Sequence, residues 1–275
     1  MSLYLDNGPP SANVNQPPPD HRRQVPAVTR AIAILRHLGR SKEPLGVNQL
    51  ARALSLVPST CLHILRVLTE EGLVDFDPRT KRYAIGIGIL PIARSAIQRN
   101  GFISLIEPRL TELSAEVGAT VLATRLADAE HMVVVALSHA PLPFRLQVEL
   151  GSRFPTLISA TGRCHAAFNL VDAGTAELRT RFAALKWDHP PAFDDWLREV
   201  ELTRHDGFAV DTGRYISGVT ILAVPMFGRD GRMTHSIVAI DISERITARG
   251  QRSIIARLLQ VRDEVSNQML GDGAG

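Results

Sequence analysis

Residues 47–72 read Val47-Asn-Gln-Leu-Ala-Arg-Ala-Leu-Ser-Leu-Val-Pro-Ser-Thr-Cys-Leu-His-Ile-Leu-Arg-Val-Leu-Thr-Glu-Glu-Gly72 and contain two short helical patterns. Only Ser55-Leu-Val57 separates them, which leaves room for a sharp turn and nothing longer. The second pattern opens on Pro58-Ser-Thr60; proline fits the first turn of a helix, and the two hydroxyls can cap its start. The spacing predicts two helices joined by a tight turn, with Gly72 ending the second.

The second helix of this pair has two chemically different faces. At ~100° per residue the apolar side chains gather on one side, and hydroxyl, imidazole and guanidinium groups gather on the other. The apolar side holds Cys61, Ile64, Leu65 and Leu68, and the polar side holds Ser59, His63, Arg66 and Glu70. Such a helix, held by a partner across a tight turn, is typical of a helix-turn-helix that reads the DNA major groove. We therefore predict DNA contacts from Ser59, Thr60, His63 and Arg66.

The next segment, Leu73–Ile85, has the pattern of a small hairpin. Two strand-like runs flank Asp77-Pro-Arg-Thr80, which is a turn signal. The tip of this turn carries Arg79, Lys81 and Arg82. We predict that it is a basic wing whose three cations contact phosphate.

Positive charge is concentrated in this part of the chain. The 275 residues carry a net charge of only +3. Residues 21–83 hold 11 Lys and Arg against 5 Asp and Glu, whereas the rest holds 20 against 23. Neutralising DNA phosphates requires such a local excess, although a basic surface that is merely solvated would give the same count. Together with the helix pair and the wing, the asymmetry favours DNA as a partner.

Signals for other classes of protein are weak. The sequence has no Gly-x-Ser-x-Gly, phosphate-loop or dinucleotide motif, and its histidines lack metal-ligand spacing, so we expect no enzyme, no cofactor and no metal. Cys164 and His165 are adjacent, but neighbours on a helix point ~100° apart and do not face each other. Two cysteines, Cys61 and Cys164, suit reduced core positions. No stretch reaches the ~18–20 apolar residues of a membrane span and no signal peptide is apparent, so we expect a cytoplasmic protein.

The pattern along the chain predicts four regions. Residues 1–24, rich in Pro, Asn and Gln, are expected to form a disordered tail. Residues 25–86 should form the winged helix-turn-helix, beginning with a helix whose stripe is Val28, Ala31, Leu35 and Leu38. Residues 87–101 should form a linker helix starting near Leu90, because Pro91 fits only a first turn. Residues 102–270 should form a second domain.

The last region mixes strands and helices without a repeated βαβ rhythm, which predicts an α+β fold. Expected strands are 120–126, 132–137, 145–150, 219–227 and 233–242, the last two joined by the hairpin signal Gly228-Arg-Asp-Gly231. Expected helices are 104–117, 162–171, 175–185, 193–205 and 246–269.

One segment of this region favours a binding pocket. Leu157-Ile-Ser-Ala-Thr-Gly162 places small residues at a helix start, where free backbone N–H groups can receive a carboxylate. Asp211 follows at the end of an expected strand, and Ser217-Gly218 precedes the hairpin. Each has a plainer explanation: the glycines can serve only as caps or turns, and Asp211 can simply pair with a nearby arginine.

From Val25 to about Met269 the chain resembles the IclR-type bacterial transcriptional regulators. Motifs in the family's order carry the resemblance: Val25-Pro-Ala-Val-Thr-Arg-Ala-Ile-Ala-Ile-Leu, Leu50-Ala-Arg-Ala-Leu-Ser-Leu-Val-Pro-Ser-Thr, Leu68-Thr-Glu-Glu-Gly-Leu-Val, Asp77-Pro-Arg-Thr-Lys-Arg-Tyr, Gly151-Ser-Arg-Phe-Pro and Gly207-Phe-Ala-Val-Asp-Thr-Gly-Arg-Tyr-Ile-Ser-Gly-Val. The resemblance implies an N-terminal winged helix-turn-helix, a linker helix and a C-terminal GAF-like effector-binding domain. It also implies homodimers or homotetramers on palindromic operators, and a small metabolite that changes DNA binding, as in a repressor or activator of a catabolic operon.

The resemblance further implies a ligand site, from which this chain departs. The family's backbone-donating turn matches Ala160-Thr161 and its acid matches Asp211. A cysteine and two serines of members that bind small polar acids correspond to Ile221, Val238 and Ile240, so we expect a larger, partly apolar effector such as an aromatic acid. Family members usually carry Arg where this chain has His63, which implies a weaker, pH-sensitive DNA contact. The alternative is a metabolite-binding module or enzyme whose helix-turn-helix contacts protein.

Overall fold

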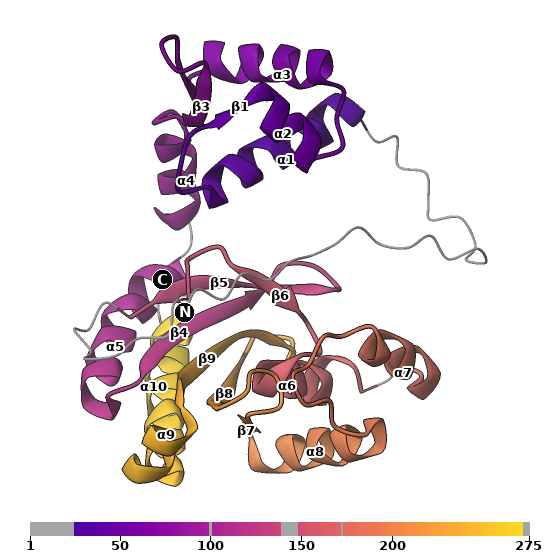
Figure 1. Ribbon diagram of the computed structural model, residues 1–275. Helices are drawn as coiled ribbons and strands as arrows, with labels where there is room; N and C mark the ends of the chain where they lie inside the picture. The colour runs from indigo at the N-terminus through magenta and orange to yellow at the C-terminus, as the bar shows by residue number, and fades with distance from the viewer. Residues whose placement is uncertain (1–24, 99–100, 139–147, 172, 272–275) are drawn as a thin grey trace. The chain divides into compact units, whose positions relative to one another are not determined.

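The computed structural model describes residues 25–98, 101–138, 148–171 and 173–271, which form two compact units (Figure 1). The first contains residues 25–98, and the second contains the described residues from 101 onward. Each unit has its own buried apolar core. The predicted tail, residues 1–24, lies outside the described residues.

The first unit is a winged helix-turn-helix, as predicted. Its elements are α1 (Pro26–Arg40), β1 (Leu45–Gly46), α2 (Val47–Ala53), α3 (Pro58–Glu70), β2 (Val74–Asp77), β3 (Arg82–Ile85) and α4 (Ile89–Gln98). The axes of α2 and α3 form an angle of 113° across the turn at residues 54–57, which is within the range of helix-turn-helix pairs. The three strands pair antiparallel in the order β1-β3-β2, so the wing is fastened to the start of α2 through β1.

The core of this unit confirms the apolar face predicted for α3. Cys61, Leu65 and Leu68 are buried against α1, α2 and the wing strands. The stripe predicted for α1 is wrong at its beginning, because Val28 is 55% exposed. Burial of α1 begins one to two turns later, with Ala31 and Leu35 half-buried and Ile34 and Leu38 fully inside.

Glycines fasten the end of α3 to the start of α4. Gly72 adopts a left-handed φ of +68° directly after Glu71, the C-cap of α3. A Cβ on either Gly86 or Gly88 would lie 2.5 Å from the carbonyl oxygen of Gly72, to which the Gly88 N–H donates a 3.0 Å hydrogen bond. Only glycine permits this close approach. The linker helix then begins at Ile89, which confirms Pro91 in its first turn.

The second unit is an α+β domain built on a six-stranded antiparallel sheet. The strands are β4 (Thr120–Leu126), β5 (His131–Leu137), β6 (Arg153–Pro155), β7 (Ala209–Thr212), β8 (Val219–Phe227) and β9 (Met233–Ile242), in the order β6-β5-β4-β9-β8-β7. One face is covered by α5 (Gly101–Val117), α9 (Ser243–Arg249) and α10 (Gln251–Gly271) (Figure 1). The other is covered by α6 (Ser159–Asn169), against which α7 (Thr175–Ala183) and α8 (Phe193–Asp206) pack.

Both faces of the sheet are therefore buried, which explains the continuous apolar run of β8. Leu222 and Val224 contact the layer of α5 and α10, while Ile221 and Ala223 point toward α6. Strands covered on both faces lose the alternation of apolar and polar residues. The face toward α6 is called here the α6 face; it carries the candidate ligand-binding residues.

Two predicted elements of this domain need correction. Within the predicted strand 145–150, residues 145–147 lie outside the described residues and 148–150 are not a strand; the edge strand is β6, just after Gly151. The predicted helix 246–269 is two helices, because Gly250 has a φ of +87° that interrupts the helical path. The hairpin strands 219–227 and 233–242 are confirmed to the residue.

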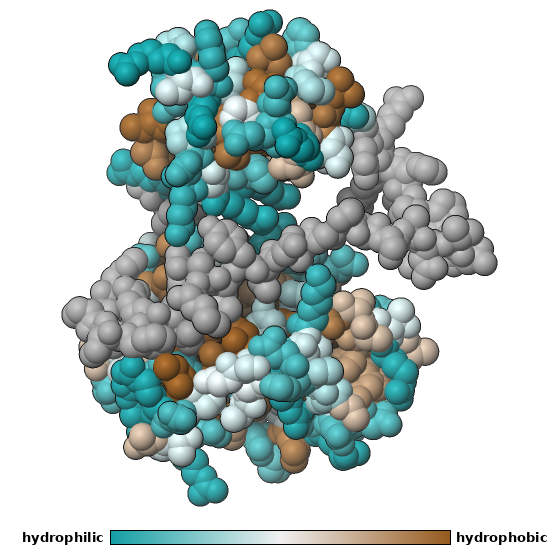
Figure 2. Space-filling model, viewed as in Figure 1, coloured by the Kyte–Doolittle hydropathy of each residue, from teal (hydrophilic) through white to brown (hydrophobic). Residues whose placement is uncertain are grey.

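No single helix in the described part of the chain is long and apolar enough to cross a membrane. The pair α2 and α3 meets that test only as a sharply bent pair, by length and composition alone. Both helices contribute buried residues to the core of the first unit. Apolar residues also reach the surface in separate patches among hydrophilic ones (Figure 2).

Candidate functional site

The polar face of α3 is exposed as predicted. Ser59, His63, Arg66 and Glu70 are open to solvent, and Thr60 is half-buried. The predicted capping by the hydroxyls is wrong: the N-cap is Val57, and no side chain caps the helix. Because the helix begins at Pro58, Ser59 and Thr60 already lie inside its first turn, past the capping position. Neither hydroxyl is therefore occupied as a cap.

The wing is shaped by one carboxylate. Asp77 accepts hydrogen bonds from the Arg79 N–H (2.8 Å) and the Thr80 hydroxyl (2.7 Å). The bond from Thr80, followed by that from Arg79, lowers the pKa of the Asp77 carboxyl. Arg79 and Lys81 remain exposed at the tip, with Lys81 in the left-handed region at a φ of +57°. Arg82 differs, because its guanidinium donates to the Pro44 carbonyl oxygen (3.1 Å) and ties the wing to the segment before β1.

The cations of this unit are not neutralised by the protein. Within residues 25–98, no Arg or Lys side chain has a recorded ion pair with a carboxylate; every recorded pair between described residues lies in the second unit. No carboxylate within this unit therefore competes with an external anion for an ion pair with Arg66, Arg79 or Lys81.

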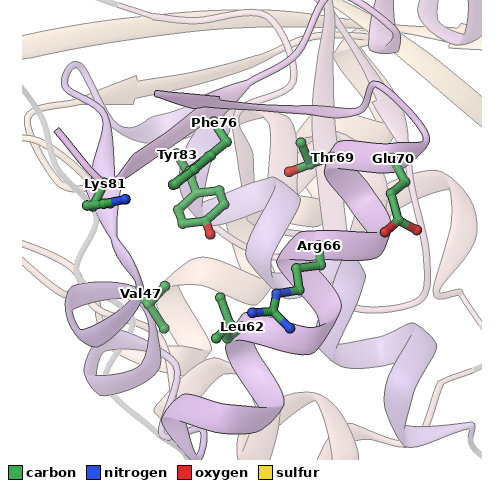
Figure 3. Close-up of a pocket in the computed structure, with 8 residues that line it drawn as sticks. All are labelled: Val47, Leu62, Arg66, Thr69, Glu70, Phe76, Lys81 and Tyr83. Carbon is green, nitrogen blue, oxygen red and sulfur yellow. The ribbon is translucent and has the colours of Figure 1, made fainter. Parts of the chain in front are cut away.

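A groove separates α3 from the wing. It has a volume of about 420 Å³ and is lined by Val47, Leu62, Arg66, Thr69, Glu70, Phe76, Lys81 and Tyr83 (Figure 3). Sequence reasoning found Arg66 and Lys81 but did not single out Phe76 or Tyr83. Alternation of side chains along β2 and along β3 places each of these rings on one face of its own strand. Only the pairing of Phe76 with Tyr83 shows that both rings lie on the same face of the sheet, the one that lines the groove.

On the α6 face of the second unit, the structure brings together residues from three segments, α6, β8 and β9. Ala160, Ile221, Val238 and Ile240 belong to one apolar cluster. Strand register explains the meeting: Ile221 lies opposite Ile240. Thr161 is also buried, in the first turn of α6. Five of the six predicted ligand-binding residues therefore lie together, and Asp211 is the sixth.

The start of α6 is an unusually tight turn. Ser159 has a left-handed φ of +59°, and the N-cap is Ile158 without a side-chain cap. A Cβ on Gly162 would lie 2.1 Å from the carbonyl carbon of Leu157, so only glycine fits. The first amides of a helix have no acceptor within it, which leaves a donor-rich edge beside the apolar cluster.

Asp211 is fully buried and already paired. Its Oδ2 accepts a hydrogen bond from Arg163 (3.3 Å), and its Oδ1 accepts from the backbone N–H groups of Arg214 (3.2 Å) and Tyr215 (3.1 Å). Arg163 is only 2% exposed and also donates to Glu199 of α8 (2.5 Å), which binds Arg214 in turn. Asp211 thus anchors the segment after β7 to α6 and α8. Sequence reasoning missed Arg163 and Glu199, since nothing local marks pairs 36 and 48 residues apart.

Cys164 and His165 do not form a reactive pair. The Cys164 thiol donates to the Ala223 carbonyl oxygen (3.6 Å), and burial raises its pKa to about 12. His165 Nδ1 contacts the Asn169 amide (3.2 Å), and burial, followed by the charge of Arg181, lowers its pKa to about 4. Neither group is charged near neutral pH. The described residues also contain no cluster of His, Cys, Asp or Glu suited to a metal ion.

Comparisons with known proteins agree with both units. Residues 27–78 match the IclR helix-turn-helix domain, and residues 94–267 match the family described as bacterial transcriptional regulator IclR C-terminal. A glycerol operon regulatory protein from Streptomyces coelicolor is 25% identical over 234 residues, covering 83% of this chain and 89% of its own length. The transcriptional repressor AllR of Escherichia coli is 24% identical, with coverages of 84% and 86%.

Solved structures share the fold. A transcriptional regulator from Alicyclobacillus acidocaldarius superposes with a TM-score of 0.79 at 24% identity, covering 89% of this chain and 98% of its own. An IclR homologue from Microbacterium hydrocarbonoxydans, solved with 4-hydroxybenzoate, gives a TM-score of 0.72 at 13% identity, with coverages of 89% and 99%. With the family matched along both units, the chain belongs to the IclR family of bacterial transcriptional regulators and is a DNA-binding regulator, not an enzyme.

Proposed function

We propose that this regulator binds a palindromic operator as a homodimer or homotetramer and controls a catabolic operon in response to a partly apolar organic acid. The observation that carries the DNA half is the exposed face of α3 beside a wing whose cations lack internal carboxylate partners within residues 25–98. Ser59, Thr60, His63 and Arg66 are assigned to the operator bases and nearby phosphates. Arg79 and Lys81, with Arg82 in a secondary role, are assigned to phosphate.

The effector half rests on the chemistry of the α6 face. The first turn of α6, with Ala160 and Thr161, offers backbone N–H groups and a hydroxyl to a carboxylate. Ile221, Val238 and Ile240 offer apolar contact to the remainder of the ligand. Burying one CH₂ group is worth ~0.8 kcal/mol. These three apolar side chains should therefore give a ring-bearing acid a higher affinity than glyoxylate.

Asp211 has a different part in this proposal. Its two oxygens already accept hydrogen bonds from Arg163 and two backbone amides, and a ligand carboxylate beside it would be repelled. We assign Asp211 to holding the segment that carries Tyr215 and Ile216 against the α6 face, where both side chains pack on the apolar cluster. It thus shapes the ligand site through that segment.

DNA binding is tested with the full chain and fluorescent duplexes taken from the region upstream of its own gene. Arg66→Ala and Ser59→Ala should each weaken binding to the preferred duplex, because a direct base contact is worth ~1–3 kcal/mol, and should weaken binding to random duplex less. Glu201→Ala, a change at an exposed site on α8, is the control. Near-normal preference for the operator in both folded variants would remove α3 as the reading helix.

Effector binding is tested by titration calorimetry on the full chain with glyoxylate and 4-hydroxybenzoate. The aromatic acid should bind more tightly, and Val238→Ser should narrow the difference by replacing apolar surface with a hydroxyl. Tighter binding of glyoxylate by the unaltered chain would contradict the assignment of Ile221, Val238 and Ile240 to a ligand's apolar body.

A further inference from the structure

We propose that the groove between α3 and the wing seats the sugar–phosphate backbone of one operator strand, with Phe76 packed on deoxyribose and the Tyr83 hydroxyl donating to a phosphate. This rests on the proposed DNA-binding function and adds two backbone contacts that the charge pattern alone does not reveal. It commits the groove to double-stranded DNA and not to a small molecule.

The position of the groove supplies the first argument. When α3 enters the major groove, its neighbours on either side are the two backbones that border that groove. The wing tip, with Arg79 and Lys81, is predicted to meet phosphate beyond one of these borders. A DNA strand that is contacted by both α3 and the wing must cross the space between these two elements. That space is the groove of about 420 Å³.

The floor of the groove matches the chemistry of that strand. Phe76 is 37% exposed and packs on Tyr83 with ring centroids 4.7 Å apart, forming an apolar wall with Val47 and Leu62. Deoxyribose lacks the 2′-hydroxyl and presents C–H surface, which suits such a wall. When a deoxyribose covers the partly exposed ring of Phe76, apolar surface of that ring is removed from water, and this burial favours binding.

The Tyr83 hydroxyl supplies the polar contact. The ring is only 5% exposed, yet Figure 3 shows its oxygen directed into the groove, toward the side from which Arg66 reaches. Burial is the largest cause that raises the pKa of this phenol, so the group keeps its proton and acts as a donor. A neutral donor held in place by packing can mark the phosphate position without adding charge.

Charges at the rim complete the fit. Arg66 and Lys81 line the groove and attract a phosphate, whereas Glu70, also in the lining, repels one. The proposal therefore assigns Glu70 a limiting role: it lowers affinity for any duplex and leaves sequence preference to Ser59, His63 and Arg66.

The test measures dissociation constants of the full chain for operator and random duplexes across a salt series. Tyr83→Phe should weaken binding to both duplexes about tenfold, as expected for a hydrogen bond to a charged group, with an unchanged slope of log affinity against log salt. Lys81→Asn, chosen because Asn tolerates the left-handed φ of this residue, should instead reduce the slope by about 1. Glu70→Gln should tighten binding to both duplexes.

Phe76→Ala should weaken binding several-fold, again without changing the salt slope. Phe76→Leu, which keeps an apolar side chain on β2, should recover part of that loss and guards against a wing that fails to fold. Val28→Ala is the matched control, since Val28 is an exposed apolar residue of the same unit outside the groove, and it should bind DNA normally.

Normal affinity for operator in both Tyr83→Phe and Phe76→Ala, with unchanged melting temperatures, would overturn the groove assignment while leaving the proposed function intact. A change in salt slope for Tyr83→Phe would also overturn it, because the hydroxyl would then act through Arg66 or Lys81. Absence of any operator preference in the unaltered chain would instead defeat the proposed function, and this inference with it.

Discussion

The two candidate surfaces of this protein are built in opposite ways. The DNA-reading surface comes from a single stretch, residues 58–83, and its side chains are mostly exposed, with cations that have no recorded carboxylate partners there. The α6 face draws Ala160, Ile221 and Val238 from distant segments, and all three are buried. Its charged groups, such as Arg163 and Asp211, are paired inside the domain.

The difference follows from what each surface must bind. A polyanion is attracted by cations that remain solvated and unpaired, and counterion release then supplies affinity. A small ligand is enclosed, so the side chains around it are removed from water and any charge among them needs a partner. The expected consequence is that substitutions on the α6 side affect stability, whereas substitutions on the helix–wing side affect DNA binding and leave stability nearly unchanged.

The largest effect is expected from Gly162→Ala. The new Cβ would collide with the Leu157 backbone at 2.1 Å, and we expect the second unit to lose more than about 5 kcal/mol of stability. Calorimetric unfolding should show its transition lowered or missing, while the transition of the winged unit is retained. Gly174→Ala is the control, because no atom lies within 4 Å of its Cβ position and it should change stability by less than about 1 kcal/mol. Equal stability of both variants would mean that the turn at α6 relaxes freely.

Breaking the buried ion pair comes next. Arg163→Met leaves the fully buried Asp211 carboxylate without its cation and should cost roughly 3–5 kcal/mol in the free energy of unfolding. Adding Asp211→Asn should restore part of this loss, because the amide oxygen still accepts from the backbone N–H groups but carries no charge. In the exposed pair Arg198–Asp195, Arg198→Met should cost less than about 1 kcal/mol. A similar cost for both arginines would contradict the difference in burial argued here.

A smaller effect is expected from pH. His165 and His235 have pKa values of about 4, lowered chiefly by burial, whereas an unfolded histidine titrates near ~6.5. Because the unfolded state then binds more protons, stability of the second unit should be complete above about pH 6.5 and fall as the pH drops toward 4. At pH 5 each histidine should cost roughly 2 kcal/mol.

His165→Asn tests this sign, since an Asn oxygen can still accept from the Asn169 amide. Urea unfolding at pH 7 and pH 5 should show a smaller loss in the variant than in the unaltered chain. An identical loss in both proteins would show that His165 does not contribute to the pH dependence.

The smallest effect on stability is expected at the wing tip. Arg79→Ala removes an exposed cation with no recorded partner except through its backbone N–H, so the free energy of unfolding should change by less than about 0.5 kcal/mol. Its DNA affinity should nevertheless fall for operator and random duplex alike, with the salt slope reduced by about 1. If Arg79→Ala instead lowered stability and left the salt slope unchanged, the wing would contribute to stability and not to DNA binding, which would contradict the difference expected between the two surfaces.

The sequence alone determined the helix-turn-helix, its exposed face and the wing, because these depend on local rules. The 3.6-residue period separates Ser59 and Arg66 from Leu65, and the Asp77 carboxylate organises its turn by accepting hydrogen bonds from Arg79 and Thr80. The hairpin strands 219–227 and 233–242 were equally readable, since Gly228 and Gly231 bracket a turn between two apolar runs.

Only the tertiary structure decided the remaining features, because they depend on pairing over long sequence separations. Asp211 has a carboxylate that sequence reasoning could place in a pocket or in an ion pair, and the contact with Arg163, 48 residues away, is what occupies it. Register across β7, β8 and β9 determines that Asp211, Ile221 and Ile240 lie in one row. The sequence around Gly250 is compatible with a continuous helix, but its φ of +87° in the structure ends α9 there. That Phe76 and Tyr83 lie side by side follows only from the pairing of β2 with β3. Local periodicity specifies which face of an element is apolar, whereas only the packed fold specifies what that face meets.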